Sequence, residues 1–164
     1  MKDAFVVRAL KQEPPSLDDA LVLIDHKAML GPDVSSPHIV SISWVEQNLL
    51  WSRKRKELFK DLFELIKDLK DVGINSSYLM IGGSFLSYKD NPGDIDGLLI
   101  YSVSGSINFS DVKAIIDRKK SNIDIRIVPE DAGTAALIKM VCFCHTLYQG
   151  EGAYQLKSPI LMVI

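Results

Sequence analysis

The chain has 164 residues, of which 47% are hydrophobic and 24% are charged, and its formal net charge is −2. This length and composition predict a single domain with a buried core, and the slightly acidic balance gives no overall positive field to attract nucleic acid. No apolar run reaches the roughly 18 residues that a membrane-spanning helix needs, and the first residues do not read as a secretory signal. We therefore expect a cytoplasmic protein without a membrane partner.

The first 50 residues carry the weakest pattern. Residues 5–10 could form a strand, and residues 17–29 could form a helix, alone or followed by a strand. Residues 31–37 combine two prolines with two serines and are typical of a loop. We interpret residues 1–50 as an N-terminal extension that packs on a core formed by residues 51–164, because one domain is enough for a chain of this length.

A long amphipathic helix is predicted over residues 51–72. Its apolar side chains recur at helical spacing, and they are Leu58, Leu62, Leu65, Ile66 and Leu69. Gly73 is expected to end the helix. Four basic residues, 53–56, lie at its start and oppose the positive end of the helix dipole. We interpret them as a solvated basic turn, with an anionic partner as the alternative.

Three apolar segments are expected to form core strands: residues 78–81, 94–101 and 123–128. In the third segment polar and apolar residues alternate. Ile123, Ile125 and Ile127 therefore line one face, and Asp124 and Arg126 line the other.

Two further helices are predicted between and after these strands. Asn108 or Ser110 can cap a short helix that runs to Asp117. A last helix is expected from the acidic turn at 129–131 to Tyr148, where glycines follow. The apolar tail after Pro159 could form an edge strand. These elements predict the α/β (α+β) class, with a small mixed sheet and helices packed mainly on one face.

A glycine-rich turn follows the first core strand. Gly82 and Gly83 end the strand, and Ser84 opens a short turn or helix. Glycine adopts backbone angles denied to other residues and lets a ligand approach the main chain closely. The N–H groups at a helix start and a hydroxyl are suited to holding phosphate oxygens. The turn is a candidate phosphate site, although the same residues are common in ordinary turns.

Three carboxylates form a candidate metal site. Asp94 and Asp96 are two residues apart in an extended segment, so they project from the same face. If the strand that carries Asp124 lies beside them, three acidic groups converge. Such groups repel each other unless a cation lies between them, and oxygen ligands beside phosphates suit Mg²⁺.

In this order, the motifs resemble those of the DNA polymerase beta-like nucleotidyltransferase superfamily. They are Ile-Gly-Gly-Ser at 81–84, a nine-residue spacer, Asp-Ile-Asp at 94–96, and Ile-Asp-Ile at 123–125. The resemblance covers roughly residues 51–148 and implies the nucleotidyltransferase fold. It is closest to the small single-domain bacterial members called minimal nucleotidyltransferases, some of which are antitoxins in toxin–antitoxin pairs. The spacer is short, and Gly97 stands where the superfamily usually has an apolar residue.

The resemblance implies transfer of a nucleoside monophosphate from a nucleoside triphosphate to an acceptor hydroxyl, with release of pyrophosphate and with Mg²⁺ or Mn²⁺ as cofactor. It assigns catalysis and metal binding to Asp94, Asp96 and Asp124, and nucleotide binding to Gly82, Gly83, Ser84, Lys89 and Arg126. Superfamily members that modify transfer RNA or antibiotics usually carry an additional helical domain, for which 164 residues leave little room. This favours a protein acceptor, such as a partner toxin.

Gly97 and the short spacer leave a second function open. A glycine inside a strand often marks a bulge or a close backbone approach, which would change the direction of Asp96. The alternative is a catalytically inactive protein of the same fold, which acts as a nucleotide sensor or as a partner-binding module. A plain structural interaction protein is a third class, but it would leave the three carboxylates without a shared role.

Overall fold

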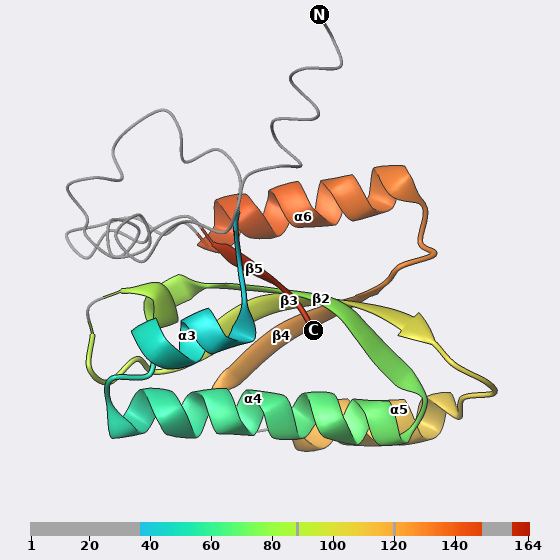
Figure 1. Cartoon of the computed structure of the whole chain (residues 1–164). Coiled ribbons are helices and arrows are strands. Elements are labelled where there is room, and N and C mark those ends of the chain that lie inside the picture. Colours follow the sequence, from blue (N-terminus) through green and yellow to red (C-terminus); the bar gives the residue numbers. More distant parts are fainter. Residues whose placement is uncertain (1–36, 88, 120, 149–158) are drawn as a thin grey trace, which may run out of the picture.

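The computed structural model describes residues 37–164, apart from residues 88, 120 and 149–158 (Figure 1). Its elements, in chain order, are β1 (His38–Val40), α3 (Ile42–Asn48), α4 (Arg53–Asp71), β2 (Ile74–Gly82), the short 3₁₀ helix η1 (Gly83–Leu86), β3 (Ile95–Val103), α5 (Phe109–Arg118), β4 (Ile123–Pro129), α6 (Thr134–Tyr148) and β5 (Ile160–Val163). The strand and helix expected before residue 31 lie outside the described residues.

The five strands form one mixed sheet in the order β1-β5-β2-β3-β4. Strand β2 runs antiparallel to both β3 and β5, whereas β3–β4 and β1–β5 are parallel pairs. The expected α/β (α+β) class with a mixed sheet is therefore confirmed. The expectation that the C-terminal tail forms an edge strand is wrong, because β5 pairs on its outer side with β1. That partner strand has three residues, too few for a readable pattern.

Helices cover both faces of the sheet, but unequally. Figure 1 shows α4 and α5 along one face and α6 alone across the opposite face. Helix α3 belongs to the first face, because its buried Trp44 and Val45 join the main apolar core. A second, smaller core lies under α6, and its buried members are Met80, Leu98, Val128, Cys144 and Tyr148. The prediction of helices mainly on one face is thus confirmed.

Part of the predicted N-terminal extension belongs to this folded unit. Strand β1 pairs with β5, and Val45 and Leu49 are fully buried in the main core. Residues 38–49 therefore contribute both to the sheet and to its packing.

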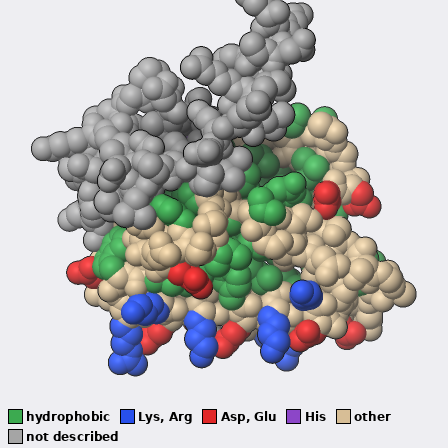
Figure 2. Space-filling model, in the orientation of Figure 1, with side chains coloured by type: hydrophobic (Ala, Val, Ile, Leu, Met, Phe, Trp, Pro, Cys, Tyr) green, Lys and Arg blue, Asp and Glu red, His purple; other side chains and the backbone are tan. Residues whose placement is uncertain are grey.

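Helix α4 forms where the apolar spacing predicts it. Ser52 caps its start, because its hydroxyl accepts a hydrogen bond from the Arg55 N–H at 3.2 Å. Its buried stripe includes Leu58, Leu62 and Leu69. Gly73 follows the helix with a φ of +91°, a conformation that favours glycine. In Figure 2, basic and acidic side chains alternate along the exposed side of this helix.

The later helices, α5 and α6, can be compared with the helix starts predicted from the sequence. The Asn108 side chain caps α5 and accepts a hydrogen bond from the Ser110 N–H at 3.0 Å, as expected. Helix α6 begins at Thr134, later than the predicted start at residues 129–131. The reason is that β4 continues to Pro129, and the Glu130 N–H donates to the Tyr101 carbonyl of β3 at 2.7 Å. Across the described part of the chain, no helix is both long enough and apolar enough to cross a membrane.

Candidate functional site

The glycine-rich turn lies directly against a carboxylate. Strand β2 ends at Gly82 and passes without a break into η1, which begins at Gly83. Gly83 has a φ of +65°, and a Cβ atom there would overlap the carboxylate of Asp96. Glycine is therefore needed at position 83 for two reasons: the positive φ of the backbone and the close approach of Asp96 to the α-carbon.

Gly82 is required for a different contact. A Cβ atom there would overlap the side chain of Tyr148, in the last turn of α6. The Tyr148 hydroxyl also donates a buried hydrogen bond to the Gly97 carbonyl at 2.8 Å. The close approach to Gly82 that we expected from a ligand is thus made by this tyrosine, and a nucleotide-binding role for Gly82 stays a prediction.

Gly97 lies in a regular part of the sheet. It pairs with Ile81 on one side and with Ile125 on the other. A Cβ atom at Gly97 would come within 2.6 Å of both Ile125 Cδ1 and the Met80 carbonyl oxygen. The glycine therefore allows close packing of the sheet, and the one irregularity in the β2–β3 pairing lies between Ser76 and Tyr78.

The three candidate carboxylates meet at one end of the strands. Asp96 of β3 lies opposite Asp124 of the parallel strand β4, so both side chains project from the same face. This is the face covered by α6, because Leu98 projects from it two residues further along β3. Asp94 precedes β3, and its Oδ1 accepts a hydrogen bond from the Ser84 hydroxyl at 3.3 Å. The structure thus brings together Asp94, Asp96, Asp124 and the turn at 83–84.

Electrostatics couples these carboxylates. Burial, followed by the negative charges of Asp94 and Asp124, raises the pKa of Asp96 to about 6 from its ordinary value of 3.8. A bound cation would reverse this effect, because an opposite charge favours the ionised carboxylate.

Asp124 is more open to solvent than Asp96. Its side chain is 62% exposed, and Lys119 Nζ lies 3.9 Å from its Oδ1. An ion pair this exposed adds little stability and leaves the carboxylate free to exchange partners. Arg126, two residues further on the same face, places its guanidinium 5.5 Å from the ring centroid of Phe143 in α6. Both residues lie on the strand face predicted from the sequence.

A metal ion at this site would need oxygen ligands from a substrate in addition to the carboxylates. Among the residues that the structure describes, no group of three or more Asp, Glu, His or Cys side chains could hold a metal ion by itself. Mg²⁺ is usually bound by one or two carboxylates together with phosphate oxygens and water. Asp94 and Asp96, which lie against the Gly83–Ser84 turn, fit this second kind of site.

Comparison with known protein families shows which family this chain belongs to. A family model matches residues 22–154, which is most of the chain and includes all three carboxylates. The chain belongs to the DUF6932 family. Its members are described as a family of unknown function, so the match assigns no activity. No curated protein and no solved structure matches the chain.

Sequence reasoning about this DUF6932 protein missed two residues next to the site. The sequence pattern places Tyr148 only at the end of a helix, whereas the structure shows that it contacts Gly82 and Gly97. The interpretation of residues 53–56 as a solvated basic turn is wrong for Arg55, which is fully buried. Its position three residues before Leu58 places it on the apolar stripe of α4, and this spacing is the signal that could have identified it.

Proposed function

We propose that this DUF6932 protein is a nucleotidyltransferase that depends on Mg²⁺ or Mn²⁺ and moves a nucleoside monophosphate from a nucleoside triphosphate to an acceptor hydroxyl. The observation that carries the proposal is the contact between the Gly83–Ser84 turn and two carboxylates, Asp94 and Asp96, with Asp124 on the adjacent strand. A fold class hosts many functions, so the proposal rests on this arrangement of residues.

Each residue has a proposed role. The N–H groups of the turn and the Ser84 hydroxyl bind phosphate oxygens, since such turns form anion-binding concavities. Asp94 and Asp96 would hold the cation together with the triphosphate, and Asp124 would assist metal binding, orient the acceptor hydroxyl and favour loss of its proton as pyrophosphate leaves. The bound cation would neutralise charge on the transferring group. Arg126 and Lys89 supply further positive charge to the phosphates.

We propose a protein as the acceptor, such as a toxin that pairs with this chain in the cytoplasm. Helix α6, whose last turn contacts Gly82, exposes large apolar side chains along its length: Ile138 is 59% exposed, and Phe143 and Leu147 are each 49% exposed. Exposed apolar groups of this kind often mark surfaces that contact other proteins. They support a protein acceptor better than a small one.

A second candidate function is nucleotide sensing or partner binding without turnover. The exposure of Asp124 and its proximity to Lys119 favour this candidate, because the acceptor-orienting role needs a carboxylate held firmly in place. Both candidates use the same nucleotide site, so binding alone does not separate them.

The test combines nucleotide binding with transfer. We expect the wild type to bind a nonhydrolysable triphosphate only with Mg²⁺ or Mn²⁺, and to label an acceptor in a lysate of its source cells from an α-labelled triphosphate. Asp96→Asn should remove both activities, whereas Asp124→Asn should remove labelling and keep much of the binding. Asp117→Asn is the matched control, since that carboxylate is exposed on α5 and pairs with Lys113.

Two results would change the conclusion. Binding without labelling by any of the four nucleotides would favour the sensor. Absence of metal-dependent binding by the wild type, or equal binding by Asp96→Asn, would contradict both candidates.

A further inference from the structure

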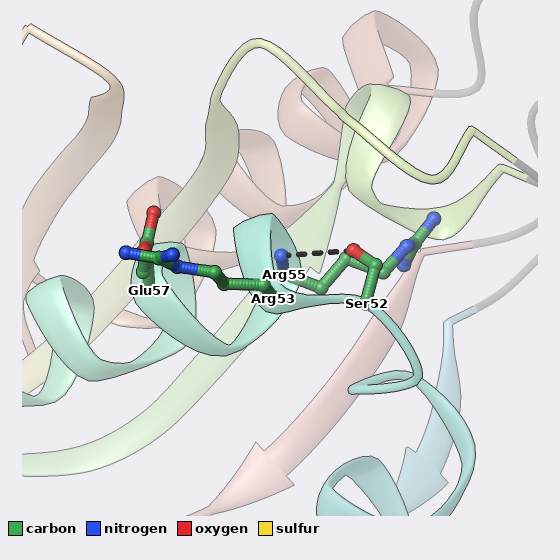
Figure 3. Close-up of polar contacts among 4 residues, drawn as sticks. All are labelled: Ser52, Arg53, Arg55 and Glu57. Carbon is green, nitrogen blue, oxygen red and sulfur yellow. Dashed lines mark hydrogen bonds and ion pairs between the residues drawn. The ribbon is translucent and has the colours of Figure 1, made fainter.

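The arginine at residue 55 has surroundings unlike those of its basic neighbours. Arg53 has a side chain that is 94% exposed and pairs with Glu57 at 2.8 Å. Arg55 is 0% exposed. In Figure 3 the Arg53 side chain extends toward Glu57, while the Arg55 side chain extends in the other direction. Burial lowers the pKa of Arg55 to about 10, an effect that the charge of Asp90 partly offsets.

The guanidinium of Arg55 binds main-chain carbonyls. Its Nη1 donates to the Phe85 carbonyl at 2.6 Å and to the Leu49 carbonyl at 3.2 Å, its Nε donates to the Lys89 carbonyl at 3.0 Å, and its Nη2 donates to the Ser87 carbonyl. Three of these four carbonyls belong to the spacer that begins directly after Ser84. One side chain therefore holds alternate residues of this spacer.

Two aromatic rings and a second set of hydrogen bonds also contact this region. The guanidinium lies 3.6 Å from the ring centroid of Trp51 and 5.2 Å from that of Phe85. Trp51 Nε1 also donates to Asp90 Oδ1 at 3.0 Å, and the Ser52 hydroxyl donates to the Asp90 carbonyl. The start of α4 thus holds the spacer from Phe85 to Asp90 at several points.

The held segment continues directly into the candidate site. Ser87 donates to the Ser84 carbonyl twice, from its N–H at 3.1 Å and from its hydroxyl at 2.7 Å. Ser84 in turn donates to Asp94, and Gly83 lies against Asp96. A displacement of the Ser87 carbonyl would therefore move the turn relative to both carboxylates.

We propose that Arg55 is a positioning residue, which sets the Gly83–Ser84 turn relative to Asp94 and Asp96 by holding the main chain that follows the turn. An apolar side chain could fill the same buried space at a lower desolvation cost, since replacing buried charges by hydrophobic groups is often neutral or stabilising. Only the planar fork of arginine, with N–H donors on three nitrogens, can reach these carbonyls together. The kinetic part of this inference rests on the proposed function.

The experiment compares Arg55→Lys and Arg55→Met with Arg53→Met, which removes one positive charge from the same helical turn. Amide exchange is followed at Ser87 and, for the sheet, at Leu79 and Leu99. In Arg55→Lys we expect exchange at Ser87 to be about tenfold faster or more, with the sheet amides unchanged, because lysine donates from a single nitrogen. Arg53→Met should match the wild type.

The second measurement is kcat/KM for the triphosphate, well below the melting temperature of each variant. We expect a loss of about tenfold or more in Arg55→Lys and a larger loss in Arg55→Met, because displacement of a binding turn by even 1 Å can cost about 100-fold. Arg53→Met should again match the wild type. If the wild type neither binds nor transfers nucleotide, the proposed function fails while the exchange measurement still tests the positioning role.

Three outcomes would overturn the positioning role. The first is a folded Arg55→Lys with wild-type exchange at Ser87 or, where the wild type is active, wild-type kcat/KM. The second is faster exchange spread equally over the turn and the sheet. The third is failure of both variants to fold, because Arg55 would then serve the stability of the whole domain.

Discussion

At the scale of single residues, Gly83 is needed both for the backbone of the turn and for the position of Asp96 in the candidate site. Its φ of +65° and its contact with the Asp96 carboxylate are both incompatible with a side chain. Gly105 has a similar φ of +75° but nothing near its missing Cβ, and Gly93 has neither feature. Substitutions at these three positions can therefore distinguish the stability lost through backbone strain from the stability lost by displacing Asp96.

We expect Gly83→Ala to lower the free energy of unfolding by about 1–3 kcal/mol and to abolish nucleotide binding. Gly105→Ala should show only the strain, about 1 kcal/mol, and Gly93→Ala should change little. Urea titration and calorimetric titration with nucleotide and Mg²⁺ measure the two effects. If Gly83→Ala binds nucleotide like the wild type, the turn does not depend on its contact with Asp96.

At the scale of elements, α6 covers the face of the sheet from which Asp96 and Asp124 project. Its inner side packs on Met80, Leu98 and Val128, and its last turn contacts Gly82 through Tyr148. Burial raises the pKa of the Tyr148 hydroxyl well above its ordinary value, so this group stays neutral and donates a hydrogen bond to the Gly97 carbonyl. The end of the helix is thereby fixed to β3, one residue beyond Asp96.

We expect Tyr148→Phe to lower the free energy of unfolding by about 1–2 kcal/mol, because the buried Gly97 carbonyl loses this hydrogen bond while the ring packing is kept. Tyr78→Phe is the control, since Tyr78 is 39% exposed on β2. Urea unfolding curves of the two variants measure the difference. A loss of equal size in both variants would mean that the bond to Gly97 contributes nothing specific.

At the scale of the whole molecule, the mixed sheet joins segments that are far apart in the chain. Strand β4 pairs with β3 and places Asp124 opposite Asp96, while β5 pairs with β2 and extends the sheet to β1. Folding therefore brings negative charges together and partly buries that of Asp96. The stability of the domain should depend on pH for this reason.

The pKa of Asp96 is raised on folding, so the folded state binds this proton more tightly than the unfolded state. Its contribution is fully present below about pH 4 and is lost as the pH rises through about 6. Asp96→Asn should therefore be more stable than the wild type at pH 7, on the order of 1 kcal/mol after allowance for partial exposure, and nearly equal to it at about pH 4. Urea unfolding at both pH values measures this, with Asp117→Asn as control. A wild-type pH profile in Asp96→Asn would contradict the coupling of the carboxylates.

Much of the fold could be predicted from local patterns. The apolar stripe of α4, the alternation in β4 and the cap at Asn108 depend on neighbours within a few residues, and all are present in the structure. The first half of β2 was missed because Asn-Ser-Ser carries no apolar pattern. The start of α6 was misplaced because the acidic turn after Pro129 is held by Tyr101 of another strand.

The sequence by itself determined the mixed α/β class and the candidate site residues 83–84, 94, 96 and 124, because glycine geometry and strand alternation are properties of short segments. Only the tertiary structure decided what each of these residues faces. It placed Tyr148 against Gly82, Asp96 against Gly83, and Arg55 among the carbonyls of the spacer. These contacts join residues that are 13 to 66 positions apart, and such pairs meet only when the sheet and its helices pack together.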